Sequence, residues 1–133
     1  YNLLKFNILK PIHCILDKSI QCKKLCRTYA IFKKEDIWYQ NINKKIVTNN
    51  HLRYVIPMGS NNPVIMISYS DDIYTDYWKK MQYNQKKLKK TIVNLVDETF
   101  NIKINEPLKV IVSHWDCGVA YWNKNINSEL SKR

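Results

Sequence analysis

The order of apolar and polar positions along the chain predicts a sheet organised around a hairpin. Two runs rich in β-branched and aromatic residues, Arg53–Ile56 and Val64–Tyr69, flank a segment from Pro57 to Pro63 that holds glycine, serine and asparagine. A segment of this length joins adjacent antiparallel strands. Because Val64–Tyr69 is apolar at nearly every position, we expect it to be covered on both faces and to lie centrally in the sheet.

Further strands and helices are predicted on both sides of the hairpin. The other strand-like runs are Leu25–Phe32, Ile37–Tyr39, Lys45–Thr48 and Val110–Ser113. Helical spacing predicts short helices over Pro11–Leu16 and from Asp71 or Asp72 through Trp78, and a long helix over Asn84–Phe100. These elements predict one domain of the α+β class, with a mixed, largely antiparallel sheet and helices covering one face.

The chain is strongly basic, with 22 Lys and Arg against 11 Asp and Glu and a net charge of +11. Nucleic-acid binding is one explanation, and a solvated helix surface is the other. We favour the second, because Lys86, Lys87, Lys89 and Lys90 would occupy the outer faces of the long helix. The expected interaction with nucleic acid is therefore weak, dependent on salt and without sequence preference, and no specific nucleic-acid partner is expected.

Cysteine spacing and the sequence patterns of signal peptides and membrane spans indicate the cellular compartment of a protein. Cys14, Cys22, Cys26 and Cys117 lack the close spacing of a metal site, so no metal is expected, and free thiols are favoured over a disulfide. We see no signal peptide and no membrane span, which favours an intracellular, cytoplasmic protein. A start at Tyr1 rather than Met is interpreted as a piece of a longer polypeptide.

An aromatic segment follows the last predicted strand. It contains Trp115, Tyr121 and Trp122, with Gly118 among them. Glycine permits a turn or the close approach of a flat ligand, and these aromatic side chains offer large faces with polar groups. The residue types alone fit a pocket wall and a core cluster equally well.

The ordered succession of these runs resembles the substrate-side domain of FAD-dependent amine oxidases, and looks most like the versions encoded by giant DNA viruses. The matching runs are Leu25–Phe32, Ile37–Tyr39, Lys45–Thr48, Leu52–Pro57, Ile65–Asp71, Tyr77–Trp78 and Trp115–Trp122. They cover roughly residues 20 to 127. The resemblance implies that residues 1–133 wall the substrate cavity of a two-part flavoprotein whose FAD dinucleotide-binding part is absent from this chain.

In that family, hydride passes from an amine to flavin N5, and dioxygen reoxidises the flavin. The resemblance implies an amine substrate, dioxygen and the missing FAD-binding part of the same polypeptide as partners; residues 1–133 alone are expected neither to hold FAD nor to be active. It also implies that Trp115 and Tyr121, with Trp122 and Gly118 beside them, face flavin and substrate. Arg27 aligns where many members place a lysine near flavin N5. An arginine is no base near neutral pH, so Arg27 is a candidate for holding a water there.

Two other functions remain open. One is a small basic binding module for nucleic acid or an acidic partner, without catalytic activity. The other is a related flavoprotein that oxidises a C–C bond instead of an amine.

Overall fold

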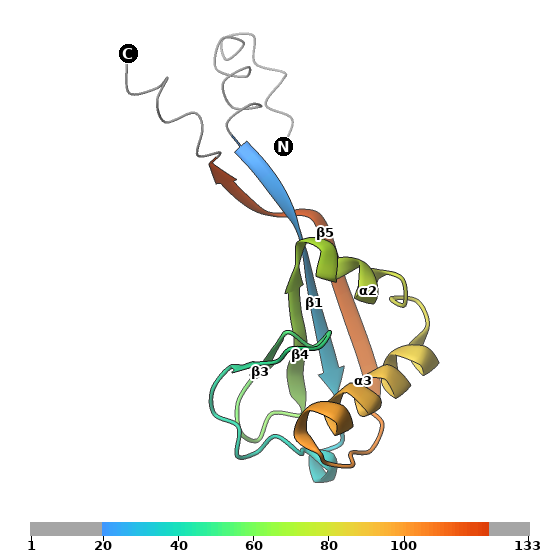
Figure 1. Ribbon diagram of the computed structural model, residues 1–133. Coiled ribbons are helices and arrows are strands. Elements are labelled where there is room, and N and C mark those ends of the chain that lie inside the picture. The colour runs from blue at the N-terminus through green and yellow to red at the C-terminus, as the bar shows by residue number, and fades with distance from the viewer. Residues whose placement is uncertain (1–19, 123–133) are drawn as a thin grey trace, which may run out of the picture.

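The computed structural model describes residues 20–122, so the helix predicted over Pro11–Leu16 lies outside the described residues. Five strands form one sheet in the order β2-β3-β4-β1-β5 (Figure 1). They are β1 Ile20–Ile31, β2 Ile46–Val47, β3 Tyr54–Pro57, β4 Val64–Asp71 and β5 Lys109–Trp122. All four pairings are antiparallel. The α+β class is thus confirmed, and within these residues the sheet is antiparallel rather than mixed.

The predicted hairpin is present as β3 and β4, with Ile56 opposite Met66. Asn62 shapes its turn, because its side-chain amide donates to the carbonyl of Met58 at 3.2 Å and its Oδ1 accepts from the backbone N–H of Val64 at 2.9 Å. β4 lies between β3 and β1, and the residues from Ile65 through Ser68 are all buried. The prediction of a central strand covered on both faces is confirmed.

Two α-helices, α2 Thr75–Lys79 and α3 Gln85–Phe100, lie on one face of the sheet (Figure 1). Two short 3-10 helices, η3 Lys34–Asp36 and η4 Asp72–Tyr74, precede them. α3 begins as predicted, because the Asn84 side chain caps it by accepting from the backbone N–H of Lys87 at 3.0 Å. It ends at Asn101, which adopts a left-handed conformation with φ of 53°. Its buried side chains, which join the core, are Leu88, Ile92, Leu95 and Val96.

Side chains alternate along a strand, which predicts that Arg27 and Tyr29 share one face of β1 and that Cys26, Thr28 and Ala30 share the other; burial confirms this division. Cys26, Thr28 and Ala30 are fully buried in the core, whereas Arg27 and Tyr29 are half-buried on the opposite face. Neither α2 nor α3 covers that opposite face, which we call the helix-free face (Figure 1). The sheet therefore has one face in the core and one face that carries Arg27.

Ile37–Tyr39, predicted as a short strand or an extended segment, forms no strand: these residues follow η3 and enter a turn. Tyr39 is fully buried, and its hydroxyl donates to the carbonyl of Asn62 at 2.7 Å. Trp38 packs edge-on against the Tyr39 ring at 5.4 Å. The apolar character of this run reflects burial of side chains from a turn rather than pairing in the sheet.

β5 continues well past the predicted end at Ser113, because the beginning of β1 offers it a partner. The pairing runs from Ile31 opposite Lys109 to Ile20 opposite Trp122. Beyond the body of the sheet, the start of β1 and the end of β5 extend as a two-stranded ribbon (Figure 1). The aromatic segment is therefore strand, and not a turn after a strand.

Candidate functional site

Arg27 lies between two aromatic rings on the helix-free face. It pairs across the sheet with Tyr69 on β4 and with Ser113 on β5. Its guanidinium carbon is 5.6 Å from the centre of the Tyr69 ring and 5.9 Å from the centre of the Trp115 ring. These are cation–π distances. Arg27 and Trp115, two candidates from distant parts of the sequence, are thus brought together.

Arg27 has no acid within ion-pair distance among residues 20–122, and its Nε is buried without a hydrogen-bond partner. The neighbouring lysines on β1 are paired instead: Lys23 lies 3.6 Å from Asp72, and Lys24 lies 3.1 Å from Asp76. The hydrogen bond from Lys24 lowers the pKa of Asp76. Asp72 and Asp76 are thus paired with lysines. Asp71, which lies opposite Leu25 at the end of β4, forms no ion pair with Arg27, so the guanidinium remains free for another acceptor.

No protein-family model matches the sequence. No curated protein matches it either.

The aromatic row extends beyond the predicted residues. The Tyr69 ring meets Tyr54 of β3 edge-on at 6.0 Å between ring centres, and Arg53 lies over Tyr54 at 5.9 Å and over Tyr74 at 4.0 Å. The Nε of Arg53 is also buried without a partner. Sequence reasoning missed these residues because it did not place Tyr54 beside Tyr69 across the predicted hairpin. The available signal was a tyrosine in each of two predicted neighbouring strands.

Tyr121 and Trp122 lie apart from Arg27, on the projecting ribbon. The Tyr121 hydroxyl donates to Oε1 of Gln21 at 3.0 Å, and Trp122 is 59% exposed. Together with Ile20 and Ala120 they line a hollow of about 130 Å³, which neither Arg27 nor Trp115 lines. The structure thus brings together Arg27 and Trp115 but not Arg27 and Tyr121.

Gly118 is needed for close packing between strands, and not for the expected turn. The pairing passes from Lys23 opposite Val119 to Leu25 opposite Trp115, so that three β5 residues face one β1 residue in a bulge. A Cβ on Gly118 would lie 2.2 Å from Cβ of Leu25. Only a residue without a side chain fits there.

Replacing Gly118 with Ala is expected to destabilise the chain by about 1–3 kcal/mol, because the methyl group overlaps the root of the Leu25 side chain. Urea unfolding monitored by circular dichroism measures the change. The double variant Gly118→Ala with Leu25→Gly removes the overlapping Cβ and should lose less than the sum of the two single variants. Additive losses would argue against this contact.

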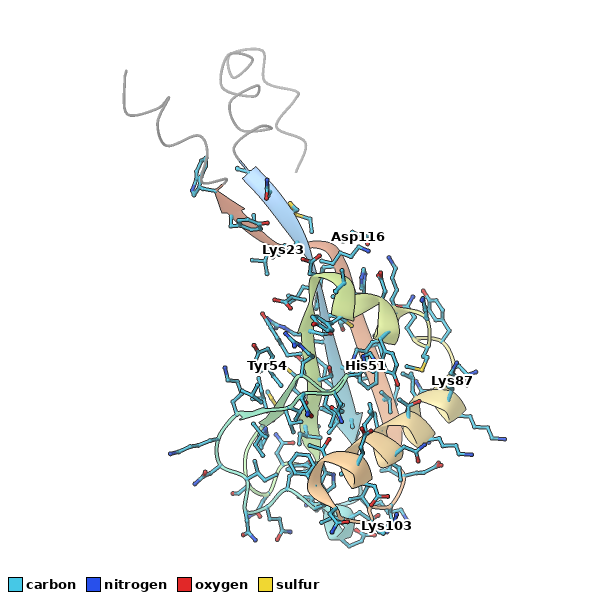
Figure 2. All side chains as sticks on the ribbon, in the orientation of Figure 1. Lys23, His51, Tyr54, Lys87, Lys103 and Asp116 are labelled. Atoms are coloured by element: carbon cyan, nitrogen blue, oxygen red, sulfur yellow. A yellow bond between two sulfur atoms is a disulfide. The ribbon has the colours of Figure 1, made fainter. Side chains whose placement is uncertain are left out.

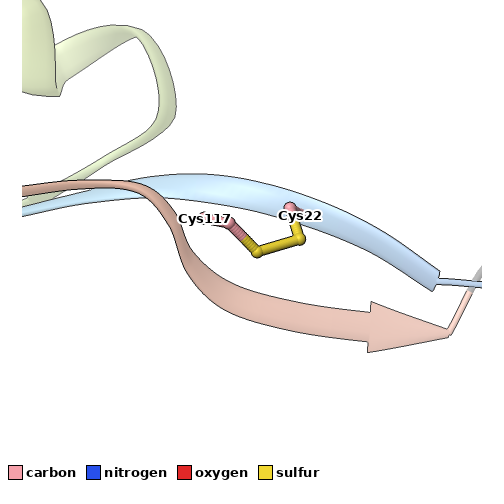
Figure 3. Close-up of a disulfide and its surroundings, with 2 residues drawn as sticks. All are labelled: Cys22 and Cys117. Atoms are coloured by element: carbon pink, nitrogen blue, oxygen red, sulfur yellow. A yellow bond between two sulfur atoms is a disulfide. The ribbon is translucent and has the colours of Figure 1, made fainter. Parts of the chain in front are cut away.

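A disulfide joins Cys22 of β1 to Cys117 of β5 across the bulge, with Cα atoms 4.9 Å apart (Figure 3). The expectation of free thiols is therefore wrong for this pair. The antiparallel pairing of β1 with β5 brings together two cysteines that are distant in sequence, and spacing along the chain does not reveal this. Cys26 is free and buried, and burial raises its pKa to about 11, so that it remains a thiol near neutral pH.

The lysine run lies on the outside of α3, as predicted. Lys86, Lys87 and Lys90 are exposed and Lys89 is half-buried, and Figure 2 shows Lys87 pointing away from the sheet. Within residues 20–122 there is no group of three or more His, Cys, Asp or Glu that suits a metal ion. No helix in the same part of the chain is long and apolar enough to cross a membrane.

Proposed function

We propose that this chain is the substrate-side segment of an FAD-dependent amine oxidase-like oxidoreductase, and that the helix-free face walls the substrate cavity beside the flavin. The observation that carries the proposal is the contact of Arg27 with Trp115 at 5.9 Å. These residues come from two separate motifs of the resemblance. Their meeting on the sheet face that neither α2 nor α3 covers supports a shared cavity wall.

The residues of this face fit one side of a flat ring and not a whole cofactor. Trp115 is 43% exposed and Tyr69 is half-buried, so both present aromatic surface beside a fixed cation. Arg27, Tyr69 and Trp115 line neither of two hollows of about 190 and 130 Å³ found elsewhere among residues 20–122. In this proposal the chain contributes a wall, and the FAD-binding part of the same polypeptide supplies the phosphate contacts.

The chemistry that FAD supplies in this family is acceptance of hydride from the carbon beside an amine nitrogen, with reoxidation by dioxygen. Trp115 and Tyr69 exclude water from the cavity wall. Arg27 stays protonated and takes no proton from the substrate. Its positive charge disfavours a second cation nearby and so lowers the pKa of a neighbouring amine, which favours the neutral amine whose lone pair assists hydride loss.

The test uses the full-length polypeptide that contains residues 1–133, purified with FAD and mixed anaerobically with a panel of amines. Flavin absorbance should bleach with at least one amine. Trp115→Ala should slow this reduction about tenfold or more while FAD stays bound, because the wall that orients the substrate is lost. Tyr121→Ala and Arg27→Met test the other two candidates in the same way.

A matched control is Tyr83→Ala, since Tyr83 is 93% exposed between α2 and α3 and should leave the rate unchanged. A full-length polypeptide that binds no flavin, or whose flavin no amine reduces, would contradict the proposal. If an amine reduces the flavin of the Trp115→Ala variant at the normal rate, Trp115 is not part of the site, although the family assignment still stands.

A further inference from the structure

Among residues 20–122, no acid lies within ion-pair distance of the Arg27 guanidinium. Tyr69 and Trp115 approach its guanidinium from neighbouring strands, and its Nε–H is shielded from water but donates to no acceptor. A buried donor left without an acceptor is costly, and an acceptor that reaches it recovers that cost. The Arg27 guanidinium can therefore bind an anionic group from outside residues 20–122.

We infer that Arg27 is a binding site for the carboxylate group of a small ligand that lies on the helix-free face. The guanidinium presents a planar fork of N–H donors, which matches the two oxygens of a carboxylate. Trp115 and Tyr69 beside it offer apolar surface for the body of the ligand. The ligand class is therefore a carboxylate with a flat or apolar body.

Nucleic acid fits this face less well. Bases of a single strand stack on free aromatic faces. Beyond Tyr69 the aromatic row continues to the Tyr54 ring, which Lys45 already covers at 4.8 Å and Arg53 at 5.9 Å. A strand that stacked successive bases along the row would have to displace these cations, whereas a small ligand beside Arg27 would not.

Carboxylate binding at Arg27 does not depend on a flavin. Combined with the proposed function, on which this step rests, it narrows the substrate to amines that also carry a carboxylate. Arg27 would pair with the carboxylate and repel a substrate that carries only positive charges. A polyamine is thus excluded in favour of an amino acid or a related amino carboxylate.

The test is an NMR titration of the 133-residue chain without FAD, with three probes that share one ring and differ in charge: benzoate, benzamide and benzylamine. Benzoate should shift the indole N–H resonance of Trp115, and the other two should not. Arg27→Met should abolish the shift. Arg27→Lys should weaken benzoate binding about tenfold, because the charge remains and the paired hydrogen bonds are lost.

Arg53→Met is the matched control, because Arg53 is also stacked on aromatic rings but contacts Tyr54 and Tyr74 instead of Trp115. It should leave the Trp115 response unchanged. Equal shifts with benzamide, or benzoate shifts that persist in a folded Arg27→Met variant, would overturn the inference. A Trp115 shift produced by a single-stranded oligonucleotide and by none of the carboxylates would assign the face to nucleic acid instead. Benzoate binding by a chain whose full-length form lacks amine-dependent flavin reduction would reject the proposed function alone.

Discussion

Reduction of the Cys22–Cys117 disulfide is expected to lower the free energy of unfolding by about 4 kcal/mol. The two cysteines are 95 positions apart, so the bond closes a long loop in the unfolded chain and removes much of its conformational freedom. In the folded chain the same bond joins the two strands of the ribbon (Figure 3). It lies at the bulge that contains Gly118. Both effects favour the folded state.

The measurement is urea unfolding with and without a reducing agent, compared with the variant Cys22→Ser with Cys117→Ser. The double variant should unfold at the lower urea concentration under both conditions, which separates the loss of this bond from other effects of the reductant. If the reducing agent leaves the urea midpoint unchanged, the disulfide does not restrict the unfolded chain enough to affect stability.

Replacing Trp78 with Ala should cost about 3–5 kcal/mol, because the side chain is fully buried and its removal leaves a large cavity between α2 and the sheet. Its indole Nε1 also donates to the carbonyl of His51 at 3.0 Å. The Ser68 hydroxyl donates to the same carbonyl at 3.1 Å, so Trp78→Phe keeps one donor there and most of the packing. The phenylalanine variant should therefore lose clearly less stability than the alanine variant.

Thermal and urea unfolding of the two Trp78 variants give the comparison, with Tyr83→Ala as the control. Tyr83 is 93% exposed and its removal should change the stability by less than about 0.5 kcal/mol. Equal losses for Trp78→Ala and Trp78→Phe would place the stabilising contribution in the indole hydrogen bond rather than in packing.

Arg27 is part of both the proposed flavoprotein site and the proposed carboxylate site, but each proposal can be rejected independently of the other. The first depends on a flavin and on residues beyond this chain, whereas the second is measured on residues 1–133 alone. Arg27 is the one of the five predicted site residues that is replaced in both experiments. It is therefore the position at which a small set of variants discriminates most between the possible functions.

Local pattern was sufficient for several elements of the fold. β-branched and aromatic composition around a turn identified the β3–β4 hairpin, and helical spacing with Asn84 at its start identified α3 within one residue. Alternation also put Cys26 and Arg27 on opposite faces of β1, and the structure shows that the Cys26 face is the core. These features depend on residues that are close in sequence, so they can be predicted from the sequence alone.

Contacts between distant segments were decided only by the tertiary structure. Pairing of β1 with β5 extended the last strand to Trp122, made Gly118 a packing requirement and joined Cys22 to Cys117. Placement of β1 between β4 and β5 put Arg27 between Tyr69 and Trp115. The sequence thus determined most of the strand-forming runs and the β3–β4 hairpin, since both follow from local pattern. It did not determine that β1 lies between β4 and β5, because that depends on the packing of the whole sheet against α2 and α3.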